Sequence, residues 1–218
     1  MLRAGQALDN GRGSDTFRIM ALAQAVSVPI PAPTHDLEAA RAAVVATRLA
    51  ELMGIFVRPA MSRIDRAMVG QVIEAAADAG LAEAVASRRD AANPGERTIQ
   101  AFVDALLASP RPAQEIANLV PILGYDMLQQ LVGSSAVSLR RYASEARTPP
   151  DEVARRIHYA ATLIAVLRGS FNEFGIRRWF ERVHPTLGKA PAAALGPGFE
   201  PDDEAAQDVL RTALSLLG

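Results

Sequence analysis

Apolar residues recur at helical spacing through most of this chain. Three such segments precede residue 110: residues 36–57, residues 63–88 and residues 96–108. In each of them Leu, Ile, Val, Met or Phe returns every three or four positions, which is the pattern of a helix with one buried face. β-branched residues are scattered and do not alternate with polar ones, so no strand is predicted. The sequence therefore predicts an all-α fold.

Glycine and proline residues mark where these helices end. Pro59 stops the first helix, and Gly80 divides the second segment into two apolar stripes. Asn93-Pro94-Gly95 has the composition of a turn. The Ser109–Pro112 segment closes the third helix, and we predict a boundary there between an N-terminal helical region and a C-terminal module.

The segment from Ala113 to Ala143 predicts a helix-turn-helix. Its first helix ends at Gly124, a short second helix ends at Gly133, and Ser134 or Ser135 caps a third helix. Leu131 and Leu139 are expected to hold the second and third helices together. A helix-turn-helix uses such a geometry to place its last helix in the major groove of DNA.

The exposed side of that third helix carries the candidate DNA contacts. Hydroxyl and guanidinium groups at the start of a recognition helix can donate to phosphates and base edges. The chain as a whole has a net charge of −1, but residues 111–182 hold ten arginines against seven carboxylates. A helical hairpin with solvated arginines would show the same local bias. The predicted DNA-contacting residues are Ser134, Ser135, Ser138, Arg140 and Arg141.

The C-terminal quarter combines an aromatic cluster with a proline-rich turn. A long helix is expected after Thr148-Pro149-Pro150 and ends at Gly169. Phe171, Phe174, Trp179 and Phe180 then follow at near-helical spacing. The stretch 184–191 resembles an ordered turn, a short helix starts at Pro191, and a last helix opens after residues 201–204. Trp179 and Phe180 fit either core packing or an aromatic anchor in an interface.

The C-terminal sequence from Trp179 to Gly196 resembles a known family. Trp179-Phe180, followed by His184-Pro185-Thr186-Leu187-Gly188-Lys189-Ala190-Pro191 and Ala194-Leu195-Gly196, resembles the toxin-binding domain of Xre/MbcA/ParS-type antitoxins. The preceding helix-turn-helix and long linking helix match the family's order, and the resemblance covers residues 113–218. His184 stands where that family commonly has Asn, and Tyr142 stands where its recognition helix often has Trp.

The resemblance implies an antitoxin that covers the active-site entrance of a RES-type, NAD-consuming toxin and that can repress its own operon. The toxin-binding residues carried over from the motif are Trp179, Phe180, His184, Pro185, Leu187, Gly188, Pro191 and Leu195. The implied partners are the cognate RES-domain toxin and operator DNA, with the chain as a homodimer or in a hetero-oligomer with the toxin. A stand-alone helix-turn-helix transcriptional regulator is the alternative.

Composition narrows the chemistry that the chain can support. Cysteine is absent, which excludes disulfides, thiolate zinc sites and cysteine nucleophiles. The three histidines, His35, His158 and His184, lie far apart and lack acidic residues at metal-ligand spacing. No Gly-x-Ser-x-Gly motif or phosphate-binding glycine loop is present. We therefore expect a binding protein rather than an enzyme, with no metal and no cofactor.

The expected organisation has four parts. Residues 1–34 form a flexible leader, which lacks the clean apolar region and small-residue cleavage site of a signal peptide. Residues 35–110 form the N-terminal helical region, residues 111–168 the helix-turn-helix with its linking helix, and residues 169–218 the toxin-binding domain. No apolar run is long enough to cross a membrane, so no membrane partner is expected. The predicted location is the cytoplasm.

Overall fold

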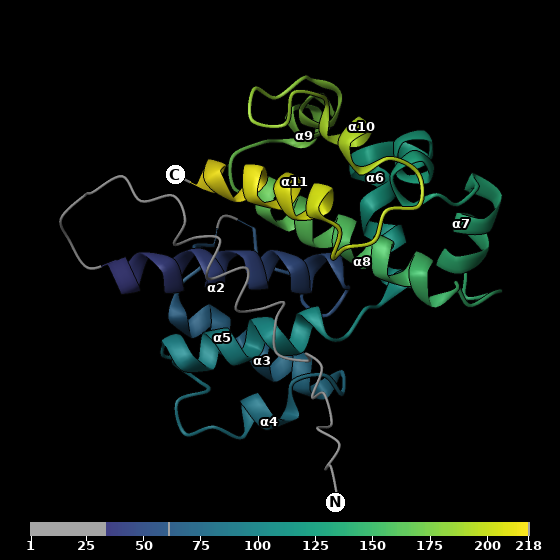
Figure 1. Cartoon of the computed structure of the whole chain (residues 1–218). Helices are drawn as coiled ribbons and strands as arrows, with labels where there is room; N and C mark the ends of the chain where they lie inside the picture. The colour runs from purple at the N-terminus through teal and green to yellow at the C-terminus, as the bar shows by residue number, and fades with distance from the viewer. Residues whose placement is uncertain (1–33, 61, 218) are drawn as a thin grey trace, which may run out of the picture.

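The structure, a computed structural model, describes residues 34–60 and 62–217 (Figure 1). Over these residues all regular structure is helical, which confirms the predicted all-α class. The predicted leader lies outside the described residues apart from Thr34, which already begins a helix. The helices are α2 (Thr34–Leu52), α3 (Arg66–Asp78), α4 (Glu83–Ala86), α5 (Glu96–Leu107), α6 (Pro112–Val132), α7 (Ala136–Ala143), α8 (Asp151–Leu167), α9 (Glu173–Glu181), α10 (Pro191–Leu195), α11 (Glu204–Leu214) and the 3₁₀ turn η1 (Ser215–Leu217).

Helix α8 lies at the centre of the molecule. Val153 and every residue from Arg156 to Leu167 are buried, so this helix is covered on all sides rather than along one stripe. Helices α2, α6 and α11 pack against it (Figure 1). The alanines of α8 explain this close packing, because small side chains leave room for several neighbouring helices to approach one axis.

The N-terminal helices form a layer on the other side of α2, which lies between α5 and α8 (Figure 1). Helix α2 ends at Leu52, five residues before the predicted end, because Gly54 adopts a left-handed φ of 68° and turns the chain. Helix α3 starts one residue after Asp65, whose carboxylate accepts a hydrogen bond from the Met68 N–H at 2.9 Å.

The predicted turn at 93–95 is also formed, and one carboxylate holds it. Asp90 accepts hydrogen bonds from the Gly95 N–H at 3.0 Å and from the Thr98 hydroxyl at 2.8 Å. The backbone at Ala92 lies directly against α3, where a Cβ at Gly70 would come within 2.4 Å of the Ala92 carbonyl oxygen. Glycine is therefore required at position 70 for the turn to pack on the helix.

The buried side chains form one cluster on both sides of the Ser109–Pro112 segment. Leu49 and Met53 from the N-terminal region belong to the same core as Ile157 and Leu163 of α8. The predicted N-terminal region and C-terminal module therefore share a hydrophobic core. Within the described residues, every helix is too short or too polar to span a lipid bilayer.

Candidate functional site

The first half of the candidate site is the chain reversal between α6 and α7. Helix α6 is interrupted at Gly124, which has φ 75° and ψ 163°, three residues after Pro121. The two halves, ending at Leu123 and starting at Tyr125, correspond to the first and second helices that the sequence predicts. At the far end Gly133 takes a left-handed φ of 66°, and its N–H donates to the Gln129 carbonyl. The predicted role of Gly133 as the turn residue is confirmed.

Ser135 is the residue that starts α7. Its hydroxyl oxygen accepts a hydrogen bond from the Ser138 N–H at 3.1 Å, and the side-chain oxygen of Gln129 accepts one from the Ala136 N–H at 3.2 Å. Leu131 and Leu139 are both buried, and α6 packs against α7. The helix ends, the turn glycine and the serine cap thus lie at the predicted residues, and their arrangement as a helix-turn-helix stays a prediction.

The predicted DNA contacts lie on the outer side of this turn. Arg140 and Arg141 are exposed, as is Ser135, whereas Ser134 and Ser138 are partly buried. The Arg140 guanidinium carbon lies 4.5 Å from the centre of the Tyr125 ring, a cation–π geometry that holds the side chain against its own fold. Arg141 has no such ring contact within the described residues. Contact of these five residues with DNA remains a prediction.

The second half of the candidate site is the turn between α9 and α10, residues 182–190. The His184 N–H donates to the Lys189 carbonyl at 3.1 Å, and the N–H groups of Leu187 and Gly188 both donate to the His184 carbonyl. Gly188 has a left-handed φ of 65°, and Pro191 opens α10 at the first helical position. The turn predicted from the sequence is therefore closed by its own backbone.

The predicted toxin-binding residues divide between the core and the surface. Trp179 is 3% exposed, and its ring contacts those of Phe180 and His184 at centroid distances of 5.2 and 5.1 Å. Phe180, Pro191 and Leu195 are buried as well. His184 and Leu187 are partly exposed, and Pro185 and Gly188 are exposed. Of the two roles left open for Trp179, this monomer shows core packing, and a toxin contact by the exposed members remains a prediction.

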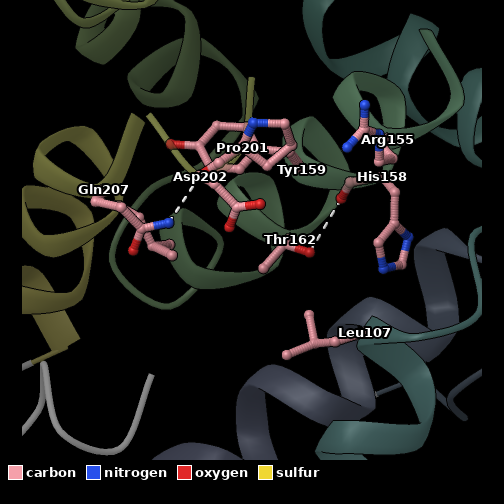
Figure 2. A pocket seen from close by; sticks show the side chains of 9 residues that line it. Leu107, Arg155, His158, Tyr159, Thr162, Pro201, Asp202 and Gln207 are labelled. Carbon is pink, nitrogen blue, oxygen red and sulfur yellow. Dashed lines mark hydrogen bonds between the residues drawn. The ribbon is translucent and has the colours of Figure 1, made fainter. Parts of the chain in front are cut away.

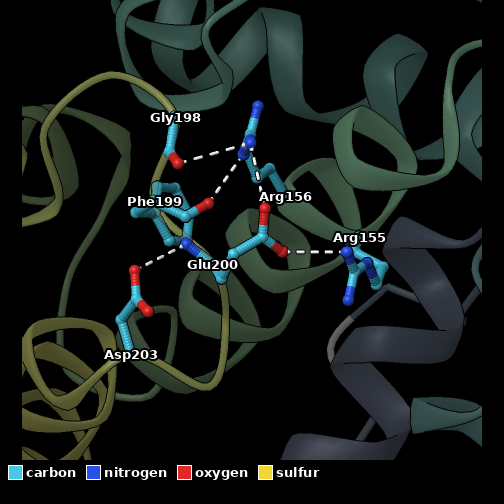
Figure 3. A network of polar contacts seen from close by, with 6 residues as sticks. All are labelled: Arg155, Arg156, Gly198, Phe199, Glu200 and Asp203. Atoms are coloured by element: carbon cyan, nitrogen blue, oxygen red, sulfur yellow. Dashed lines mark hydrogen bonds and ion pairs between the residues drawn. The ribbon is translucent and has the colours of Figure 1, made fainter.

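A buried arginine holds the loop between α10 and α11 against the central helix (Figure 3). Arg156 of α8 donates from Nε to the Phe199 carbonyl at 2.6 Å and from Nη2 to the Gly198 carbonyl at 3.3 Å. Its Nη2 also pairs with a carboxylate oxygen of Glu200 at 3.1 Å, and Arg155 pairs with the other oxygen at 2.9 Å. These contacts fasten the α10–α11 loop to α8.

The same arginine lies beside the turn after α6. A Cβ at Gly133 would stand 3.4 Å from the Gly198 nitrogen and 3.7 Å from Nη1 of Arg156. The α6–α7 turn, α8 and the α10–α11 loop thus meet at one point. In the sequence Arg156 is one of the ten arginines of residues 111–182 and was not predicted to be a functional residue. Its burial could have been predicted from its position. Arg156 lies three residues after Val153 and four before Ala160, which places it on the apolar stripe of α8.

A second buried polar pair joins α6 to α8. Nδ1 of His158 lies 2.5 Å from a carboxylate oxygen of Glu115, and both side chains are buried. In the part of the chain that the structure describes, the other carboxylate oxygen and Nε2 of the imidazole have no hydrogen-bond partner. No acidic residue stands at metal-ligand spacing from His158 in the sequence, and its partner Glu115 comes instead from a helix 43 residues earlier in the chain.

His158 also borders a small cavity of about 170 Å³ between α5, α8 and α11 (Figure 2). Tyr159 lines it and donates its hydroxyl proton to the Ala206 carbonyl at 2.6 Å, and burial raises the pKa of this phenol above its ordinary value. Among the residues that the structure describes, no three potential metal-ligating side chains lie together. The cavity has neither a nucleophile activated by a base nor a metal-ligand set.

Comparison of the chain with known family models, with curated proteins and with solved structures finds no match.

Proposed function

We propose that this chain is a cytoplasmic antitoxin that binds and neutralises a RES-type, NAD-consuming toxin through residues 169–218. The observation that carries the proposal is the turn between α9 and α10. Its backbone is closed by three internal hydrogen bonds, its base rests on buried aromatic rings, and its tip is exposed. A rigid projecting segment loses little conformational entropy when a partner covers it, which favours binding.

The exposed apolar groups of this turn indicate which side chains would contact the toxin. Val183 is 69% exposed, Pro185 is exposed and Leu187 is partly exposed. They alternate along one short segment between α9, which carries Trp179, and α10. Under this proposal Val183, Pro185 and Leu187 form the contact, while Trp179, Phe180, Pro191 and Leu195 support it from below.

The test is co-expression with the product of the adjacent open reading frame as the candidate toxin. The wild-type chain should restore growth and co-purify with the toxin in a stable complex. Val183→Asp and Leu187→Asp should weaken the complex at least tenfold, because each places a charge in an apolar contact. Val137→Asp is the matched control, since Val137 is 57% exposed on the distant α7. If the product of the adjacent open reading frame is not toxic and does not co-purify with the chain, the proposal is refuted.

The α6–α7 turn supports a second candidate function, binding to operator DNA. Arg140 and Arg141 are exposed in the last turn of α7, the helix that Ser135 caps at its start, and guanidinium groups there could contact phosphates or base edges. In gel-shift assays on the chain's own upstream DNA, Arg141→Ala should reduce affinity more than Arg140→Ala, because Arg140 already stacks on Tyr125.

Arg211→Ala provides the control for that assay, since Arg211 is an exposed arginine on α11. Unchanged binding by the double variant Arg140→Ala/Arg141→Ala would exclude α7 as the DNA-contacting helix.

A further inference from the structure

Four arginines line one groove on the face where α2, α8 and α9 meet. Arg48 comes from α2, Arg58 from the segment after it, Arg168 from the end of α8 and Arg177 from α9. The groove they share with Phe171, Asn172 and Phe174 has a volume of about 560 Å³. A second hollow of about 630 Å³ adjoins it and shares Arg58 and Arg168. These four residues define the arginine groove.

Carboxylates do not balance the charge of this groove. Glu51 pairs with Nε of Arg58 at 2.8 Å and lies 3.9 Å from Nη1 of Arg168, so one carboxylate serves two guanidinium groups. Glu173 also lines the groove but forms no ion pair within the described part of the chain. With four arginines and two glutamates the lining carries a net charge of +2, in a chain whose total is −1.

Among the four arginines of the groove, Arg48 has the positive charge that is least compensated by neighbouring groups. Its Nη1 is buried and has no hydrogen-bond partner among residues 34–60 and 62–217. Burial lowers the pKa of its guanidinium below the ordinary value, the nearby charges of Arg58 and Arg168 lower it further, and Glu51 only partly opposes them. A buried donor without a partner costs free energy, so the positive charge of Arg48 is poorly compensated where its side chain lines the groove.

The chemistry of the groove selects the kind of anion. A guanidinium group presents a planar fork of N–H donors that matches phosphate oxygens, and several forks can share one phosphate group. A single carboxylate offers two oxygens and one negative charge, which does not satisfy three guanidinium groups. At the rim Phe174 is 66% exposed, an aromatic face on which a planar ring could stack.

We propose that the arginine groove binds a small phosphate-bearing anion, with Arg48, Arg58 and Arg168 holding the phosphate. Inorganic pyrophosphate and nucleotide diphosphates share this chemistry, and the assay below separates them. The proposal does not rest on toxin or DNA binding, because no residue of the α6–α7 turn or of the 182–190 turn lines the groove. Its test uses the full chain alone.

The experiment is isothermal titration calorimetry with pyrophosphate and with ADP, at constant ionic strength and with chloride as the background anion. The wild-type chain should bind pyrophosphate saturably. Arg58→Gln and Arg168→Gln should each weaken binding at least tenfold. Their side chains are 33% and 39% exposed, so these variants should still fold. Arg178→Gln on α9 removes the same charge outside the groove and should bind as the wild type does.

The titration with ADP shows whether the bound phosphate belongs to a nucleotide or to an inorganic anion. Tighter binding of ADP than of pyrophosphate, lost in Phe174→Ala, would assign a nucleotide, and equal affinities would assign an inorganic anion. Either result supports a phosphate site. Absence of saturable binding, or equal affinity for the wild type and Arg168→Gln, would overturn it. Binding of a DNA duplex that pyrophosphate does not displace, with pyrophosphate itself unbound, would overturn it as well.

Discussion

Replacing Arg156 with alanine should detach the α10–α11 loop from α8. The guanidinium group bonds to Phe199, Gly198 and Glu200 at once and so joins all three to the central helix (Figure 3). Its removal leaves the Phe199 carbonyl without that donor in a buried position. The variant therefore tests whether this network holds the C-terminal segment in place.

The expected cost can be worked out from the individual contacts. A hydrogen bond to a charged group contributes about 1.5–3 kcal/mol when it is buried, which applies to the bond between Nε and the Phe199 carbonyl. The Gly198 contact is longer, at 3.3 Å, and the Glu200 side chain is 37% exposed and keeps Arg155 as a partner, so both contribute less. Together they predict a loss of about 2–4 kcal/mol in the free energy of unfolding. For a chain of this length, each kcal/mol lowers Tm by roughly 2–4 °C.

The assay is thermal and urea unfolding followed by the fluorescence of Trp179, the only tryptophan. Arg155→Ala is the matched control, because it removes a neighbouring arginine that is 55% exposed and should cost at most about 1 kcal/mol. Hydrogen exchange should show faster exchange in residues 196–203 of Arg156→Ala. If the two variants are equally stable and exchange alike in this loop, the reasoning about the Arg156 network is refuted.

Three further predictions concern other parts of the fold. Trp179→Ala should lower the free energy of unfolding by about 3–5 kcal/mol, because it empties a buried aromatic site; circular dichroism measures this, and a change below 1 kcal/mol would contradict the core assignment. The Gly95 N–H lowers the pKa of Asp90, so this carboxylate should add stability above its ordinary pKa and lose it as pH falls through the lowered value. The Tm difference between wild type and Asp90→Asn should therefore be present at pH 7 and vanish in acid, whereas a constant difference would argue against it. Gly70→Ala should destabilise by about 1–3 kcal/mol or more in urea unfolding, since the added Cβ meets the Ala92 carbonyl, and an unchanged midpoint would contradict that close approach.

The helices and the turns between them could be predicted from the sequence because their signals are local. Gly124, Gly133 and Ser135 each act within a few residues, through left-handed φ or a capping hydroxyl. The same rules misplaced the end of α2, where apolar residues continue past Gly54 although the helix has already ended at Leu52. Those later residues, Ile55 and Phe56, pack on the core from an irregular segment.

Contacts between distant segments could not be predicted in this way. Glu115 reaches His158, and Arg156 reaches Phe199, across 43 residues in each case. Arg48 and Arg168 meet although 120 positions separate them, and no periodicity in either segment indicates this. The long-range geometry of the site depends on how α2, α6 and α8 pack, which a single sequence does not encode in local patterns.

Hydrogen–deuterium exchange of the chain, free and in complex with the candidate toxin, tests the central proposal most directly. The proposal predicts that exchange slows in peptides covering residues 182–190 when the toxin binds, because this turn is the contact, while α7 remains unchanged. Complex formation with no slowing in residues 182–190 would contradict it and would place the partner contact elsewhere on the chain.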